Sequence, residues 1–265
     1  MKTITLLNEK GGVGKTTIAL TLASALAIQN HRVVIIDADP QANATYNLQQ
    51  PEHDGLFRLL AQDAEWKSIL RLIKPAVWAG DYNTDGQLIL LPAHVNNRAI
   101  PLVIDNTNLL SERLDEIRDY ADYIIIDTNP TPSLLHAMMY RASDFILIPT
   151  FFEAFSLQGL AKTIERCKQE SIQRSRLGRP PLTLLGIQPT QYDGRTNAHQ
   201  YGYQQTRNHY RDHILNPIAQ RTNWRDAAYA RRSIFAECPG TPAADEAWSM
   251  VFTINKILNG VKVNG

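Results

Sequence analysis

The chain has 265 residues, of which 20% are charged and 44% hydrophobic, and its formal net charge at pH 7 is +1. This length suffices for one sizeable α/β domain with a full core. No apolar run approaches the roughly 20 residues of a transmembrane helix, and no secretory leader is expected because a strand pattern begins almost at the first residue. Two cysteines, Cys167 and Cys238, are too few for a disulfide framework and lack metal-ligand spacing.

The first predicted elements are a strand over 2–8, a glycine-rich loop and a helix over 15–29. The loop contributes Lys10, Gly11, Gly12, Val13, Gly14, Lys15, Thr16 and Thr17. Glycines let backbone N–H groups curl around a polyphosphate, and the helix N-terminus adds further donors and a favourable dipole. This order of elements is typical of a phosphate-binding loop, in which Lys15 reaches the β- and γ-phosphates and the Thr16 hydroxyl binds Mg²⁺.

Strand and helix patterns alternate along the rest of the chain. Further strands are predicted over 32–37, 87–91, 122–127, 144–149 and 182–189, and helices over 107–120, 132–142, 156–174, 197–213 and 241–259. Because the apolar runs of the strands are continuous, helices should cover both faces of the sheet. The predicted fold class is therefore α/β, with a doubly wound, mainly parallel sheet and ligands at the carboxyl ends of the strands. No long linker is seen, so we expect a single domain over 1–265 without a separate helix-turn-helix module.

Two predicted strands end in acidic residues, at the edge of the sheet where a ligand is expected. Asp37 and Asp39 stand at the end of strand 32–37 in the order Asp-Ala-Asp-Pro-Gln, and a single capping role would not explain both. Asp127 ends an apolar run that is typical of a Walker B strand, where a carboxylate can hold a Mg²⁺-bound water. These positions predict a metal and phosphate site at the carboxyl edge.

Charge is unevenly distributed along the chain. Residues 166–232 hold twelve Lys or Arg and four Asp or Glu, a local excess of +8, and eleven of the twelve are arginine. Arginine suits phosphate recognition, so this segment is typical of a polyanion-binding face. The alternative is a set of solvated helix faces with internal ion pairs.

The glycine-rich loop and the acidic motif resemble those of the ParA/MinD family of ATPases. The loop matches the deviant Walker A pattern KGGxGK[ST], with Glu9 in place of the usual glycine and the extra lysine Lys10 beside it. The motif at Asp37 and Asp39 matches the pattern DxDPQ. Similar segments follow at 155–160, with Ser156 as a plausible N-cap, and at 189–196, 217–227 and 233–239, so the resemblance spans nearly the whole chain.

The resemblance implies a P-loop NTPase of the deviant Walker A type that hydrolyses ATP with Mg²⁺. It places Lys10, Lys15 and Asp39 in catalysis: Lys10 crosses a dimer interface to the phosphates of the partner subunit, and Asp39 orients the attacking water. Residues 10–17 bind the nucleotide, and the loop over roughly 219–223 packs on the adenine. The metal is held, partly through water, by Thr16, Asp37, Asp39 and Asp127.

Within the family, ParA-type partition proteins and McdA-like carboxysome-positioning proteins are the most similar. The tail 254–265 is short, is interrupted by glycine and lacks a basic face with bulky aromatics, so no stable membrane association is expected. The resemblance implies a cytoplasmic, nucleoid-associated protein that dimerises on ATP, binds nonspecific double-stranded DNA and is released by a cargo adaptor, ParB-like or McdB-like. The expected DNA contacts are Arg195, Arg221, Arg225, Arg231 and Arg232, with Arg221 alternatively in the adenine loop.

Two other functions stay open at this point. One is a MinD-like ATPase that cycles on a membrane, and the other is a metabolic ligase on the same fold, similar to dethiobiotin synthetase. The ligase would need a small-molecule pocket and would not need Lys10. The sequence does not decide whether the cargo is a plasmid or a protein organelle such as a carboxysome.

Overall fold

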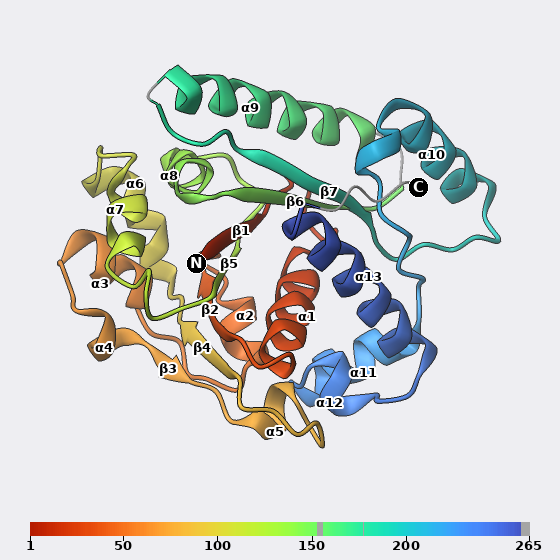
Figure 1. The fold of residues 1–265 in the computed structure, drawn as a ribbon, viewed down its shortest axis with the longest axis horizontal. Helices are drawn as coiled ribbons and strands as arrows, with labels where there is room; N and C mark the ends of the chain where they lie inside the picture. The colour runs from red at the N-terminus through yellow and green to blue at the C-terminus, as the bar shows by residue number, and fades with distance from the viewer. Residues whose placement is uncertain (153–155, 177, 261–265) are drawn as a thin grey trace.

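The computed structural model describes residues 1–152, 156–176 and 178–260. Within them a seven-stranded sheet forms the centre of the molecule, in the order β3-β4-β2-β5-β1-β6-β7 (Figure 1). All neighbouring strands are parallel except the edge pair β3 and β4. The strands are β1 (Lys2–Leu6), β2 (Arg32–Asp37), β3 (Arg71–Leu72), β4 (Gln87–Leu91), β5 (Tyr123–Asp127), β6 (Phe145–Thr150) and β7 (Thr183–Pro189). The predicted mainly parallel sheet is confirmed.

Helices cover both faces of the sheet, as the continuous apolar strands predict (Figure 1). One face carries α1 (Lys15–Ile28), α2 (Asn43–Asn47), α5 (Pro75–Trp78), α11 (Thr222–Ala230), α12 (Ile234–Glu237) and α13 (Pro242–Leu258). The other carries α3 (Gly55–Ala61), α4 (Trp66–Ile69), α6 (Ile100–Val103), α7 (Leu109–Asp115), α8 (Leu134–Ala142) and α9 (Ser156–Arg176). The remaining helices are α10 (Asn197–His209) and the short 3₁₀ helices η1 (Val95–Ala99) and η2 (Arg211–His213).

The core shows why β2 needs an unbroken apolar run. Successive side chains of a strand point to opposite faces, so Val33 and Ile35 pack with α1 and α13. Val34 and Ile36 pack into the second core, with α3 and α7. All four are fully buried, and a polar residue at any of them would lose its water without gaining a partner.

Two predicted helices are shorter than their apolar patterns suggest. The helix predicted over 107–120 ends at Asp115, because Glu116, Ile117 and Tyr120 bond three residues back in turns tighter than an α-helix. The helix predicted to reach 213 ends at His209 and continues as η2. The predicted N-cap at Ser156 follows residues 153–155, and its side chain lies outside the described part of the chain. None of the helices in the described ranges is long and apolar enough to cross a membrane.

Candidate functional site

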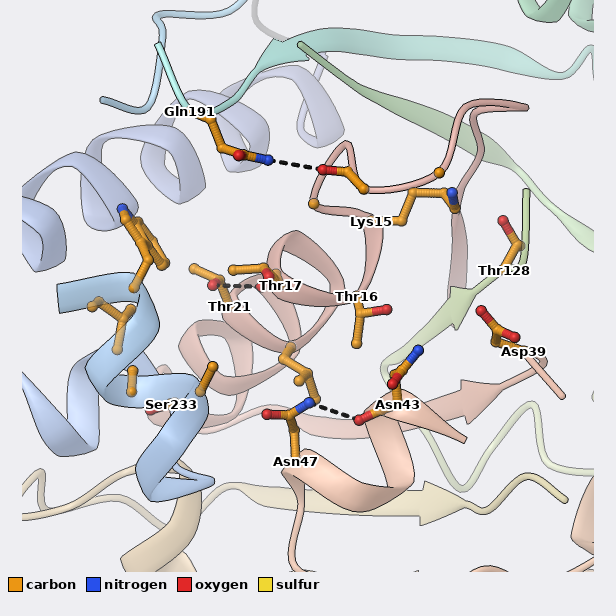
Figure 2. Close-up of a pocket in the computed structure, with 18 of the residues that line it drawn as sticks. Lys15, Thr16, Thr17, Thr21, Asp39, Asn43, Asn47, Thr128, Gln191 and Ser233 are labelled. Atoms are coloured by element: carbon orange, nitrogen blue, oxygen red, sulfur yellow. Dashed lines mark hydrogen bonds between the residues drawn. The ribbon is translucent and has the colours of Figure 1, made fainter. Parts of the chain in front are cut away.

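The loop between β1 and α1 has the backbone that a phosphate cradle requires. Gly12 and Gly14 take φ values of +73° and +84°, which side-chain-bearing residues rarely adopt. The loop is held from behind by two residues after β7. The Thr190 hydroxyl donates to the Val13 carbonyl at 2.9 Å. The Gln191 amide, drawn in Figure 2, donates to the Gly12 carbonyl at 2.8 Å. The N-terminus of α1 therefore opens onto a fixed loop, which favours binding of an anion.

A cavity of about 380 Å³ lies against this loop. Figure 2 shows Lys15, Thr128 and Asp39 on one side of it, with Asn43 and Asn47 of α2 nearby. The lining comes from the loop, from α1 and α2, from the segment after β5 and from the α11–α12 region: Gly11, Gly12, Gly14, Lys15, Thr16, Thr17, Leu20, Thr21, Asp39, Asn43, Asn47, Thr128, Pro130, Gln191, Trp224, Ala227, Ala228, Arg232, Ser233 and Ile234. The predicted phosphate loop and Asp39 thus meet at one cavity.

Lys15 and Thr16, the first residues of α1, point their polar groups at the ends of the central strands. Lys15 is only 7% exposed, and its ammonium donates to the Lys10 carbonyl at 3.1 Å. Burial lowers the pKa of Lys15, while the charges of Asp127 and Asp39 act in the opposite direction. The Thr16 hydroxyl donates to Oδ2 of Asp127 at 2.7 Å. Charge and hydroxyl are therefore in place where phosphate oxygens and a metal are expected.

Asp37 and Asp127 end neighbouring strands and are directly paired in the register of β2 and β5. Both are fully buried. Burial, together with the charge of Asp37, raises the pKa of Asp127 to about 8. Burial also raises the pKa of Asp37 to about 7, although hydrogen bonds from Thr45 act against it. Two buried carboxyls side by side favour a bound proton or a cation between them.

Oδ1 of Asp127 is buried and has no hydrogen-bond partner among the described residues. A carboxylate oxygen in that state fits a hard cation such as Mg²⁺, which prefers oxygen ligands. No group of three or more His, Cys, Asp or Glu residues in the described part could hold a metal by itself. Mg²⁺ typically takes one or two carboxylates and completes its shell with water and phosphate oxygens, and this site offers that combination.

The two aspartates of the DxDPQ motif differ in their contacts. Oδ2 of Asp37 accepts hydrogen bonds from the backbone N–H and the hydroxyl of Thr45, both at 2.7 Å, so Asp37 holds α2 to the sheet. Asp39 lines the cavity, and its Oδ1 accepts from the backbone N–H of Gln41 at 2.9 Å. Asp39 is therefore the member of the pair that faces a ligand, and a metal role for Asp37 stays a prediction.

Lys10 lies at the edge of the loop. Its backbone N–H donates to Oδ1 of Asn8 at 2.9 Å, and its ammonium lies 5.2 Å from the centre of the Phe151 ring. Beside it, Glu9 forms an ion pair with Arg166 of α9 at 2.9 Å. The reach of Lys10 to a partner subunit stays a prediction.

The five arginines expected to contact DNA have different surroundings. Arg195 is exposed and pairs through two nitrogens with Asp193, at 2.9 Å each. Arg221 pairs with Glu246 of α13 at 2.6 Å. Three others come from α11 and the turn after it. Arg225 is exposed and lines a second cavity, Arg231 contacts Tyr46, and Arg232 pairs with Glu237 at 2.9 Å. Several arginines of the basic segment 166–232 are thus engaged in internal contacts. Internal ion pairs were the alternative to a polyanion-binding face that the sequence left open.

A second cavity, of about 260 Å³, adjoins the first across Trp224 and Gln191, which line both. It is bounded by Gly14 and Thr17 on one side and by residues 218–221 on the other. The predicted adenine loop therefore lies next to the phosphate loop. The sequence did not predict four residues that line the cavities: Asn43, Asn47, Gln191 and Trp224. Of these, only Gln191 could have been expected at the site from the sequence, because it follows the carboxyl end of a predicted strand, where ligands bind in such sheets.

Comparisons with known proteins agree with this geometry. A family model described as an AAA domain matches residues 1–177. The sporulation initiation inhibitor protein Soj of Bacillus subtilis is 31% identical over 229 residues, which cover 83% of this chain and 84% of Soj. An alanine variant of McdA from Cyanothece in complex with ATP has a TM-score of 0.80 at 22% identity, over 99% of this chain and 98% of that chain. Cobyrinic acid a,c-diamide synthase from Mycobacterium smegmatis, solved with an ATP analogue and magnesium, has a TM-score of 0.74 at 22% identity, over 99% and 98%.

Proposed function

Because this chain belongs to the family of Soj/ParA chromosome-partitioning ATPases, we propose that it uses ATP to position a cargo along DNA. ATP binding forms a sandwich dimer, the dimer binds DNA without sequence preference, and a cargo adaptor stimulates hydrolysis and releases it. One arrangement supports this function most directly: Lys15, Thr16 and Asp39 face the same cavity beside the unpartnered oxygen of Asp127.

The nucleotide is held by the loop and by the start of α1. Backbone N–H groups of residues 11–17 and the Lys15 ammonium bind the phosphates, and the base enters the second cavity beside 218–221. Thr16, Asp127 and Asp39 are the residues that would hold Mg²⁺, which supplies positive charge to the phosphate oxygens when bound. Within this arrangement Asp39 orients the water that attacks the terminal phosphate.

Lys10 acts across the dimer. A second positive charge beside the phosphates stabilises the charge that develops in the transition state, as an arginine finger does. Because Lys10 stands at the edge of the loop rather than beneath it, a facing subunit is within its reach when two loops meet. The monomer is then a poor ATPase by itself, and dimerisation completes its site.

DNA binding rests on the arginines whose charge is exposed, foremost Arg195 and Arg225. Contacts to phosphates do not read sequence, so binding is nonspecific and weakens steeply with salt. The protein then acts at the nucleoid, with a plasmid or a carboxysome as cargo and a ParB-like or McdB-like protein as adaptor. The single-domain organisation over 1–265 also stays a prediction.

Relatives separate this function from that of a metabolic ligase. The likeness to the diamide synthase, at 22% identity, shows a shared fold and nothing about its reaction. The 31% identity to Soj covers most of both chains and favours partitioning.

The substitution Asp39→Ala tests the proposed cycle. Removing the water-orienting carboxylate should abolish turnover and leave ATP binding and dimerisation in place, so the variant should accumulate as an ATP-bound dimer. Size-exclusion chromatography with ATP and a phosphate-release assay measure both effects. The exposed Asp81→Asn serves as a matched control and should behave as the unaltered protein. Unchanged hydrolysis, or a variant that stays monomeric with ATP, would contradict the proposed cycle.

A further inference from the structure

Arg231, the residue that ends α11, holds a backbone conformation that glycine usually takes. Its φ and ψ are +55° and +47°. Among the described residues other than glycine, only six have positive φ, and Arg231 is one of them. A side-chain-bearing residue persists in this region only where surrounding contacts hold it there. The side chain of Arg231 must therefore gain something that glycine would not provide.

The side chain of Arg231 reaches α2, and its carbonyl is bound by a residue just after that helix. Its Nε donates to the carbonyl oxygen of Tyr46 at 2.7 Å, and its guanidinium carbon lies 4.2 Å from the centre of the Tyr46 ring. In return, the side-chain amide of Gln49 donates to the carbonyl of Arg231 at 2.9 Å. We name these three contacts the Arg231 clamp. They join segments 182 to 185 residues apart in the chain.

The helix held by this clamp also contacts the aspartate motif, which precedes it in the chain. Thr45 donates two hydrogen bonds to Asp37, and its hydroxyl also accepts from the backbone N–H of Ala93 at 3.0 Å. The backbone N–H of Ala42 donates to the carbonyl of Asp39 at 2.9 Å. Thr45 thus fixes α2 to the sheet, and Arg231 fixes the adjacent residue to α11. A shift of α2 would displace Asp39, because only three residues separate them.

We propose that Arg231 is a positioning residue for hydrolysis: it clamps α2 against the α11–α12 region and so holds Asp39 in place. Its guanidinium is already stacked and hydrogen bonded, which makes it a poor contact for DNA phosphates, in contrast to the sequence-based assignment. The effect on turnover rests on the proposed role of Asp39. Nucleotide affinity should depend on the clamp less than turnover does, because residues 11–17 form the phosphate cradle and neither Arg231 nor Tyr46 lines the cavity.

Two substitutions at one position test the clamp. Arg231→Lys keeps the charge, but an ammonium cannot both stack flat on a ring and donate from Nε. Arg231→Gly removes the side chain and suits the left-handed backbone, so the variant should fold. Both should lower kcat roughly three- to tenfold and change KM for ATP less than about twofold. Hydrogen exchange of the amides in 40–49 should become faster in both.

DNA binding and a matched arginine provide the controls. Arg231→Lys should keep the affinity for duplex DNA and its salt dependence, and Arg207→Lys, an exposed arginine of α10, should change none of these quantities. Unchanged kcat and exchange in both Arg231 variants would overturn the clamp. Lost DNA affinity in Arg231→Lys, or KM rising in step with the fall of kcat, would overturn it as well. If Asp39→Ala hydrolysed ATP normally, the proposed function would fail. Amide hydrogen exchange of residues 40–49 in the Arg231 variants would still show whether the clamp holds α2.

Discussion

The buried pair of Asp37 and Asp127 predicts that metal binding expels a proton. Burial raises the pKa of Asp37 to about 7, and burial together with the charge of Asp37 raises the pKa of Asp127 to about 8. With a pKa of about 8, roughly a tenth of Asp127 is ionised at pH 7 and roughly a hundredth at pH 6. Mg²⁺ binds the ionised form, so its apparent affinity should rise about tenfold from pH 6 to pH 7 and level off above pH 8. About one proton should leave per metal bound at pH 7.

The same carboxyls set how the stability of the nucleotide-free protein depends on pH. Their ordinary pKa is 3.8, so between about pH 4 and pH 8 the folded protein binds more protons than the unfolded chain. The free energy of unfolding should therefore fall as pH rises through this window, by up to about 1.4 kcal/mol per pH unit for each carboxyl. Mg²⁺ with nucleotide should remove this loss, because it neutralises the ionised pair.

Calorimetry measures the proton directly. Mg²⁺ with a non-hydrolysable ATP analogue is titrated into the protein at pH 7 in two buffers of different ionisation enthalpy, and the difference in heat counts the protons released. Asp127→Asn should remove both the proton and the pH dependence of metal affinity, whereas the exposed Asp81→Asn should keep them. Comparing the two variants separates the carboxyl proton from protons of the nucleotide. No proton release at pH 7, with metal affinity constant from pH 6 to pH 8, would refute the reasoning.

Three further predictions concern the loop, the aspartate motif and the DNA surface. Lys15→Ala should lose at least about tenfold in nucleotide affinity, whereas Lys10→Ala should bind ATP but not dimerise; equal loss of binding in both would place Lys10 in its own subunit's site. Thr45→Val should lower the free energy of unfolding in urea by about 1–3 kcal/mol, since Asp37 loses a buried donor, and an unchanged midpoint would contradict this. Arg225→Glu should weaken duplex binding and reduce the slope of log affinity against log salt by about 0.9 per lost contact, with dimerisation intact.

The fold could be predicted from the sequence where an apolar run was long or where a motif and its flanking elements were contiguous in the chain. Continuous apolar runs located the six long strands, and the glycine-rich loop with its flanking strand and helix located the phosphate cradle. The segment 42–104, apart from β4, was not readable in this way. It contains short helices and the two-residue β3, and helices of four to seven residues are too short to form by themselves. They exist because residues such as Leu56 and Trp78 are buried against the sheet.

Which arginines are exposed and which are paired was the hardest feature to predict from the sequence, because the partners of the paired arginines lie far away in the chain. Arg174 is buried and donates to the carbonyl of Ser143, 31 residues away, and Arg221 pairs with Glu246, 25 residues away. A count over 166–232 cannot separate such arginines from exposed ones. Composition therefore indicated a basic segment. The structure shows that only some arginines of this segment are exposed, so fewer positions remain as candidates for contact with DNA.

The two halves of the site differ in how locally they are encoded. In the proposed function, nucleotide binding depends on residues 10–17, which form one loop and one helix end, so a single motif carries it. Turnover is proposed to depend on Asp39 and Asp127. The register of β2 and β5 places Asp127 beside Asp37, two residues before Asp39, and Thr45 and Arg231 hold α2 next to this motif. Substitutions along α2 and α11 can therefore change the rate of hydrolysis without changing ATP affinity. In the proposed cycle, which is timed by hydrolysis, these contacts are where the rate would be adjusted, and the Arg231 variants measure that separation.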